Sequence, residues 1–227
     1  MKTGSNDAVA GSVAEDYVKA IHAHTEWQDQ PVTTTVLAAR LGLAASSVTG
    51  MVKKLVASGL VSHVPYGAIE LTDAGTALAL RMLRRHRLIE TWLVETFGYR
   101  WDEVHDEAEV LEHAVSDRLL EQIAGMLGNP TRDPHGDPIP GADGAVIHPA
   151  GLPLVDAIQG STVTVVRVND RDPALLRHLV DQGIELDSTV VVLGRRPFGG
   201  ALSLKVGGVE RDLGADAAAA LWVAPLR

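Results

Sequence analysis

The sequence predicts a mostly α-helical chain with a carboxy-terminal β domain, and three observations support this fold class. Apolar residues recur at helical spacing through the first half of the chain. A stretch rich in Pro, Gly and Asp interrupts that pattern over residues 128–150. Short apolar runs separated by Gly-containing turns follow from residue 152 onward. We therefore expect three domains, over residues 1–75, 76–145 and 146–227.

The first domain is predicted to hold three helices followed by a β-hairpin. Gly42 and Gly59 each stand where a helix terminator is expected, directly after an apolar run. The expected helices are Val13–His24, Val36–Leu41 and Ser46–Ser58, and the expected strands are Leu60–Val64 and Ala68–Thr72, joined by a turn at Pro65-Tyr66-Gly67. This order is that of a winged helix-turn-helix.

The winged helix carries residues that suit contact with DNA. The chain has a net charge of −9, yet it contains no Asp or Glu from Gln30 to Ile69. A local basic surface of this kind is what phosphate contact requires. The candidate DNA contacts are Thr34, Arg40, Ser46, Ser47, Thr49, Lys53 and Lys54. A helical domain that binds another protein is the alternative reading of the same pattern.

The second domain is predicted to be helical, with helices over Thr76–Phe97 and Asp106–Leu127. Both are strongly apolar. Helices of this kind, joined to a small DNA-binding unit, commonly bury one face against a second subunit. We therefore expect a homodimer whose two-fold symmetry matches paired half-sites on double-stranded operator DNA.

The third domain is predicted to be a small Src-homology-3-like barrel. Five short strands with Gly-rich turns and one helix, Pro173–Gln182, indicate this architecture. The expected strands are Ser161–Val168, Thr189–Leu193, Leu202–Val206, Val209–Asp212 and Ala220–Ala224.

Acidic and imidazole side chains gather in the helical domain at metal-ligand spacings. The chain has no cysteine, so a metal must be held by His, Asp, Glu, carbonyl groups or water. His86 and Glu90 are four residues apart on one helix, and so share a face. A second stripe is expected from His105, Glu109, Glu112 and His113. Carboxylates this close repel each other unless a cation lies between them. A solvated acidic face is the competing reading of each residue taken singly.

Five segments of the sequence form a specific pattern. The winged helix ends in IELTDAG, and the other four are EDYVKAI at Glu15–Ile21, RRHRLIETWL at Arg84–Leu93, WDEVHDEAEVLEH at Trp101–His113 and DPHGDPIP at Asp133–Pro140. With these segments the chain resembles, over nearly its whole length, the diphtheria-toxin-repressor family of iron- and manganese-dependent regulators. The resemblance implies a cytoplasmic, dimeric repressor, without enzymatic activity, that binds operator DNA when metal is bound and controls metal homeostasis genes.

The resemblance also implies two metal positions in each subunit. The ancillary position would use His86, Glu90 and His105. The regulatory position would use residue 16 together with Glu109, Glu112 and His113. In iron-sensing members residues 16 and 109 are Met and Cys, whereas this chain has Asp16 and Glu109. Carboxylates in place of sulfur favour Mn²⁺, with Fe²⁺ second, and Zn²⁺, Co²⁺ and Ni²⁺ can bind such sites in vitro.

The chain departs from the family pattern at three places. Lys19 stands where short manganese regulators have a further Glu ligand. In the barrel, Asp172 and Leu175 appear where long iron-type members supply Glu and Gln to the ancillary metal, so Asp172 alone can serve. Ser46 and Gly50 replace Pro and Gln in the recognition helix, and the operator sequence therefore cannot be transferred.

Two other classes of function are alternatives to a metal-dependent repressor. A helical carboxylate metalloenzyme would need a Glu-x-x-His pair on each of two helices, whereas this chain has His86-x-x-x-Glu90 and Glu109-x-x-x-His113. A metal-independent winged-helix regulator with a small organic ligand is the other alternative. No apolar run approaches the length of a membrane span, and the amino terminus has no apolar signal-peptide core. We therefore expect no membrane partner.

Overall fold

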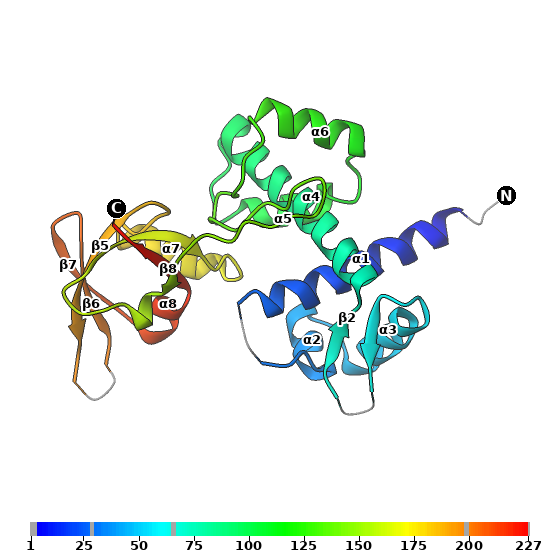
Figure 1. Ribbon diagram of the computed structural model, residues 1–227, viewed down its shortest axis with the longest axis horizontal. Coiled ribbons are helices and arrows are strands. Elements are labelled where there is room, and N and C mark those ends of the chain that lie inside the picture. The colour runs from blue at the N-terminus through cyan, green and yellow to red at the C-terminus, as the bar shows by residue number, and fades with distance from the viewer. Residues whose placement is uncertain (1–3, 28–29, 65–66, 198–199, 227) are drawn as a thin grey trace. The chain divides into compact units, whose positions relative to one another are not determined.

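The computed structural model describes residues 4–27, 30–64, 67–197 and 200–226. Figure 1 shows the helices and strands of the chain, coloured from the N- to the C-terminus. They divide into two compact units: the first comprises residues up to 85 together with 140–145, and the second comprises 86–139 and the residues from 146 onward.

The first unit contains the predicted winged helix-turn-helix. Its helices are α1 (Gly4–Thr25), α2 (Thr34–Leu41) and α3 (Ala45–Ala57), followed by the antiparallel strands β1 (Val61–His63) and β2 (Ile69–Leu71). Helix α1 begins nine residues earlier than the predicted Val13. The side chain of Thr33 caps α2, and Gly42 ends it in the left-handed conformation, as expected. Pro65 and Tyr66 of the predicted turn lie outside the described residues.

The core of this unit is formed by the apolar faces of its three helices and its hairpin. Val18 and Ile21 of α1 pack with Leu37 of α2, and with Val52 and Leu55 of α3. These residues are at most 1% exposed. The recognition helix α3 is therefore held by one face, and its other face is open to solvent.

The helices that follow differ from the prediction in one respect. Helix α4 (Asp73–Phe97) is continuous, but the predicted helix Asp106–Leu127 is wrong. It is two helices, α5 (Val104–Leu111) and α6 (Asp117–Met126). The hydroxyl of Ser116 accepts a hydrogen bond from the amide of Leu119 and starts α6 afresh. Glu112 and His113 consequently lie just beyond the last turn of α5.

The carboxy-terminal β domain contains the predicted strands and additional elements. A six-stranded sheet has the order β3-β8-β4-β5-β6-β7, and its described neighbours pair antiparallel. The strands are β3 (Leu152–Pro153), β4 (Thr162–Val168), β5 (Thr189–Arg195), β6 (Leu202–Val206), β7 (Val209–Leu213) and β8 (Leu221–Pro225). Helices α7 (Pro173–Asp181) and α8 (Ala215–Ala219) and the short turn η1 (Leu154–Asp156) complete it. The strand β3 and the helix α8 were not predicted.

Among the described residues, no single helix is both long and apolar enough to span a membrane. The consecutive helices α2 and α3 meet that criterion only as a pair, and they are bent by 112° at the break between them.

Candidate metal centre

A buried cluster of ionisable side chains lies in the second unit, where four segments meet. Helix α4 supplies His86 and Glu90, the first turn of α5 (Val104–Leu111) supplies His105, and the loop after α6 supplies Asp133 and His135. The strand-to-helix connection after β4 adds Asp170. The Glu90 side chain is fully buried, and that of His135 is equally inaccessible. Burial of this many charges is unfavourable unless they are paired or bind a metal.

The distances within the cluster are those of groups that could share one ion. Oε1 of Glu90 lies 3.0 Å from Nε2 of His86 and 3.3 Å from Nδ1 of His105. The same His105 nitrogen is 3.7 Å from the Asp170 carboxylate. Two neighbouring ligands of a single divalent ion, each at about 2.1 Å from it, are separated by roughly 3–4 Å. The donor atoms around Glu90 satisfy this condition.

Two atoms of the cluster lack hydrogen-bond partners. Oε2 of Glu90 and Nδ1 of His135 are buried, and neither has a partner within the described structure. These two atoms face each other at 3.9 Å, and Oδ2 of Asp170 is also 3.9 Å from the His135 nitrogen. Buried polar atoms are rarely left unsatisfied, and each case calls for an explanation such as an ion. The donor set therefore fits a divalent cation.

The electrostatics of the cluster show how strongly its charges interact. Burial alone would raise the pKa of Glu90, but the nearby imidazoles of His86 and His105 outweigh it and hold the pKa well below its ordinary value. Burial would lower the pKa of His135, but Asp170, Glu90 and Asp133 raise it to about 9. Burial and then the charge of Asp137 raise the pKa of Asp133 to about 8.

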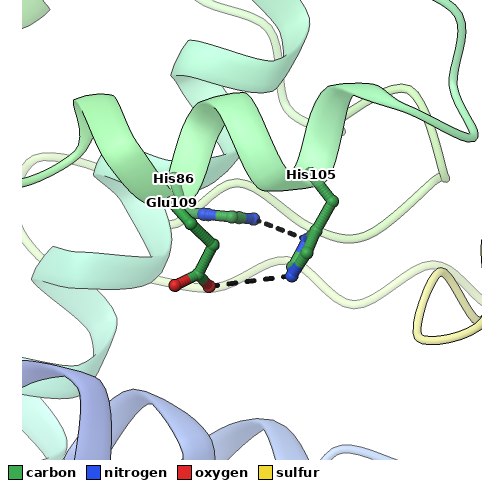
Figure 2. A group of neighbouring side chains, drawn as sticks. All are labelled: His86, His105 and Glu109. Carbon is green, nitrogen blue, oxygen red and sulfur yellow. Dashed lines mark hydrogen bonds and ion pairs between the residues drawn. The ribbon is translucent and has the colours of Figure 1, made fainter.

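A second group of donors lies beside the first and shares His86. Nδ1 of His86 is 2.6 Å from Oε2 of the fully buried Glu112 carboxylate. The imidazole of His113 is 3.4 Å from the other oxygen of Glu112. Figure 2 shows that His105 faces both His86 and Glu109. Nδ1 of His105 is 3.1 Å from Nε2 of His86, and Nε2 of His105 is 3.6 Å from Oε1 of Glu109. Glu109 is about as exposed as His105, at 40% of its side chain.

The predicted ligands thus fall into three categories. The structure brings together His86, Glu90, His105, Glu109, Glu112 and His113 within the second unit. Asp16 lies half-buried on α1 of the first unit. Asp172 is exposed, and its carboxylate accepts a hydrogen bond from the amide of Ala174 as the cap of α7.

Sequence reasoning missed Asp133, His135 and Asp170. The first two belong to DPHGDPIP, which was assigned to an irregular connection because of its Pro and Gly content. The signal was the histidine between two acidic residues within a motif that already carried the family resemblance. Asp170 is two residues before the expected Asp172, and only the fold shows which of the two faces the cluster.

The predicted DNA contacts lie on the surface of the first unit. Ser46, Ser47, Thr49, Lys53 and Lys54 are exposed on α3, whereas Thr34 and Arg40 on α2 are half-buried. The apolar face of α3 is turned inward, because Val48, Val52 and Leu55 are at most 1% exposed. The polar face of α3 is therefore available to a partner.

Comparison with known proteins identifies all three parts of the chain. Residues 10–69 match the model of the iron-dependent repressor N-terminal DNA-binding domain. Residues 72–141 match the model of the iron-dependent repressor metal-binding and dimerisation domain, and residues 152–225 match the FeoA domain.

Individual relatives cover most of the chain. Iron-dependent repressor IdeR of Mycobacterium tuberculosis is 31% identical over 86% of this chain and 89% of its own length. Diphtheria toxin repressor of Corynebacterium diphtheriae is 29% identical, with 80% and 84% covered. A solved structure of a manganese-dependent transcriptional repressor in complex with manganese is 52% identical and has a TM-score of 0.89, with 94% of this chain and 100% of that chain covered.

Proposed function

The chain belongs to the diphtheria-toxin-repressor family of iron- and manganese-dependent regulators, and from this premise we propose which of its residues bind the metal and which metal they prefer. The protein is a metal-dependent transcriptional repressor that binds operator DNA. Its dimerisation domain makes a homodimer the form that binds.

The ancillary ion is held by the predicted His86, Glu90 and His105 together with His135 and Asp170, with Asp133 beside them. The observation that carries this assignment is the pair of buried, unsatisfied atoms on Glu90 and His135 that face each other at 3.9 Å. Asp170 takes the place that the family resemblance assigned to Asp172, because the Asp172 carboxylate caps α7 instead. A divalent ion, when bound, supplies two positive charges to a group of buried carboxylates.

The regulatory ion is held by Glu109, Glu112 and His113. The support is the proximity of the buried Glu112 to both His113 and His86. Asp16 on α1 stays a predicted ligand on the strength of the family resemblance. If Asp16 contributes, binding restricts the freedom of the winged helix that follows it in the chain. Coupling free energies of about 1–3 kcal/mol suffice for a 5–150-fold change in DNA affinity.

Mn²⁺ is the proposed physiological metal, with Fe²⁺ as the alternative. The chain has no cysteine, and carboxylates stand at residues 16 and 109, so the donors are oxygen and imidazole nitrogen. Such donors suit Mn²⁺, whereas Zn²⁺, Co²⁺ and Ni²⁺ can bind the same groups in vitro. The identity is also higher to the manganese-dependent repressor, at 52%, than to IdeR, at 31%.

The surface of the helical segment supports the homodimer. Four large apolar side chains are exposed on α4, α5 and α6 and are available to a second subunit: Phe97, Val110, Leu119 and Met126. Obligate homodimer interfaces are more apolar than the rest of a protein surface.

The test is operator binding with and without Mn²⁺. The operator is first selected from random double-stranded DNA with the Mn²⁺-loaded protein. We expect Glu109→Ala and Glu112→Ala to abolish the gain in affinity that Mn²⁺ gives to the wild type. Glu107→Ala, an exposed carboxylate on the same helix, is the control and should retain it. Unchanged metal dependence in both ligand variants would overturn the proposed switch.

A further inference from the structure

We propose that Asp137 is a positioning residue. Its carboxylate, held between Arg87 and Arg167, fixes the barrel against the helical segment before any ion binds. The cluster around Glu90 and His135, called the ancillary cluster below, is thereby preorganised. This inference rests on the proposed function, since it concerns the geometry of the same cluster. Three observations carry it: a buried ion bridge, a tightly closed loop and a close backbone approach.

The ion bridge joins three segments that are far apart in the sequence. Arg87 lies on α4, Asp137 lies in the loop after α6, and Arg167 lies on β4 of the barrel. The Asp137 carboxylate accepts a hydrogen bond from Nη2 of Arg87 at 3.0 Å and a second from Nε of Arg167. All three side chains are at most 8% exposed. Removal of one partner from such a group leaves a buried charge uncompensated.

The loop that carries Asp137 also carries two members of the cluster. Oδ1 of Asp133 accepts hydrogen bonds from the amides of His135 and Asp137, each at 2.9 Å. Nη1 of Arg87 donates to the carbonyl of Pro138 at 2.7 Å. Asp133, His135 and Asp137 therefore form one closed turn, and a shift of Asp137 displaces the other two. Residues that orient metal ligands typically contribute 10–100-fold to metal affinity.

The backbone of the same loop touches the barrel. The amide of Val168 donates to the carbonyl of His135 at 2.8 Å. Gly136 has a φ of +86°, and a β-carbon there would lie 2.2 Å from the carbonyl oxygen of Val166 and 3.0 Å from Cα of Arg167. The barrel strand β4 is thus in direct contact with the loop. Asp170 follows β4 in the chain, so the bridge also sets where this carboxylate lies.

The bridge differs from the ion site because its carboxylate already faces positive side chains. Two buried guanidinium groups, on Arg87 and Arg167, face the Asp137 carboxylate, and Arg87 also lies 3.6 Å from Asp133. The bridge consequently needs no cation to be stable. Glu90 and Asp170 lie outside it, and their charges remain for the ion.

The test compares Asp137→Asn with Asp187→Asn. Asp187 forms a bidentate pair with Arg132, which also connects the segment after α6 to the barrel. That pair is exposed, at 48% and 59%, and is the matched control. Because the chain has no cysteine, spin labels can be placed at Glu107→Cys on α5 and Lys205→Cys on β6, and labelled chains can be diluted with unlabelled ones.

The first readout is the distance distribution between the two labels in the metal-free protein. We expect a narrow distribution in the wild type and in Asp187→Asn, and a broad one in Asp137→Asn. The second readout is calorimetry with Mn²⁺, in which Glu90→Gln identifies the heat that belongs to the ancillary cluster. We expect Asp137→Asn to weaken Mn²⁺ binding at the ancillary cluster about 10–100-fold. Binding at the regulatory site, which Glu112→Ala removes, should be unchanged in Asp137→Asn.

Arg167→Lys provides the second variant, because it keeps the positive charge but lacks the Nε donor. Arg167→Lys should show an intermediate loss of Mn²⁺ affinity at the ancillary cluster. If Asp137→Asn does not fold, the measurements on Arg167→Lys take its place. A narrow distance distribution together with wild-type Mn²⁺ affinity in Asp137→Asn, or in Arg167→Lys in its place, overturns the inference. If Glu90→Gln instead leaves the wild-type calorimetry unchanged, the ancillary assignment under the proposed function fails, and the metal-free distances still decide the role of Asp137.

Discussion

The ancillary cluster and the outer face of α3 both present polar side chains, but they present them in opposite surroundings. Glu90 and His135 are buried, and each has an atom without a hydrogen-bond partner in the described structure. Ser46, Ser47 and Lys53 are open to solvent, where water satisfies them. A buried unsatisfied group calls for a partner such as a water or an ion. An exposed group calls for none, and on α3 the fold, the local charge and the family relationship identify the partner.

The largest effect on Mn²⁺ affinity should follow from removing a buried metal-binding side chain. His135→Ala is expected to reduce Mn²⁺ affinity at the ancillary cluster by on the order of 100-fold or more, beyond the effect typical of a supporting residue. Calorimetry measures this loss, with the exposed His148→Ala as the control. Equal affinities in the two variants would show that the unsatisfied nitrogen of His135 does not mark a ligand.

The pH dependence should be the next largest effect, because two buried groups of the cluster have raised pKa values. The pKa of His135 is raised from 6.5 to about 9, and that of Asp133 from 3.8 to about 8. The folded protein therefore holds protons that the unfolded chain has released. The stability of the metal-free form should fall as the pH rises, through Asp133 between 3.8 and about 8 and through His135 between 6.5 and about 9.

Mn²⁺ binding should have the opposite pH dependence. The ligands must lose their protons to bind, so affinity should rise over the same window by up to about tenfold per pH unit for each proton released. Calorimetry at pH 7 in buffers of different ionisation enthalpy measures the released protons directly. An absence of proton release would contradict the raised pKa values of both His135 and Asp133.

A smaller effect is expected on the exposed face. Lys53→Ala and Lys54→Ala should each weaken operator binding several-fold and reduce the slope of log affinity against log salt by about 0.9, if each contacts one phosphate. Lys205→Ala, an exposed lysine on the barrel, is the control. An unchanged salt slope in both recognition-helix variants would assign these lysines to solvent rather than to DNA.

The smallest effect should come from Asp172. Its carboxylate caps α7, and Asp172→Ala should cost about 1 kcal/mol of stability. Mn²⁺ affinity should stay at the wild-type value, because Asp170 is the carboxylate near His105. Thermal unfolding and calorimetry on the same variant separate the two quantities. A tenfold loss of Mn²⁺ affinity without a loss of stability would restore Asp172 as a candidate ligand.

The two regions also differ in how far the sequence could predict them. The helices of the winged domain follow from local signals such as the Thr33 cap and the terminator Gly42. The break at Ser116 was missed, because apolar periodicity continues across it and a single capping hydroxyl decides it. The ancillary cluster draws on the loop at 133–137 and on residue 170, and only tertiary packing brings these segments to Glu90.

The contact between the loop at residues 133–137 and β4 tolerates no side chain at Gly136, for reasons of shape alone. Gly136 has no side chain that could bind a metal, yet a single methyl group there would meet the backbone of β4. Any other residue would act as a wedge between the loop and the barrel without altering one ligand atom. Loss of metal response can therefore arise in this protein from a substitution that leaves every acidic and imidazole group in place.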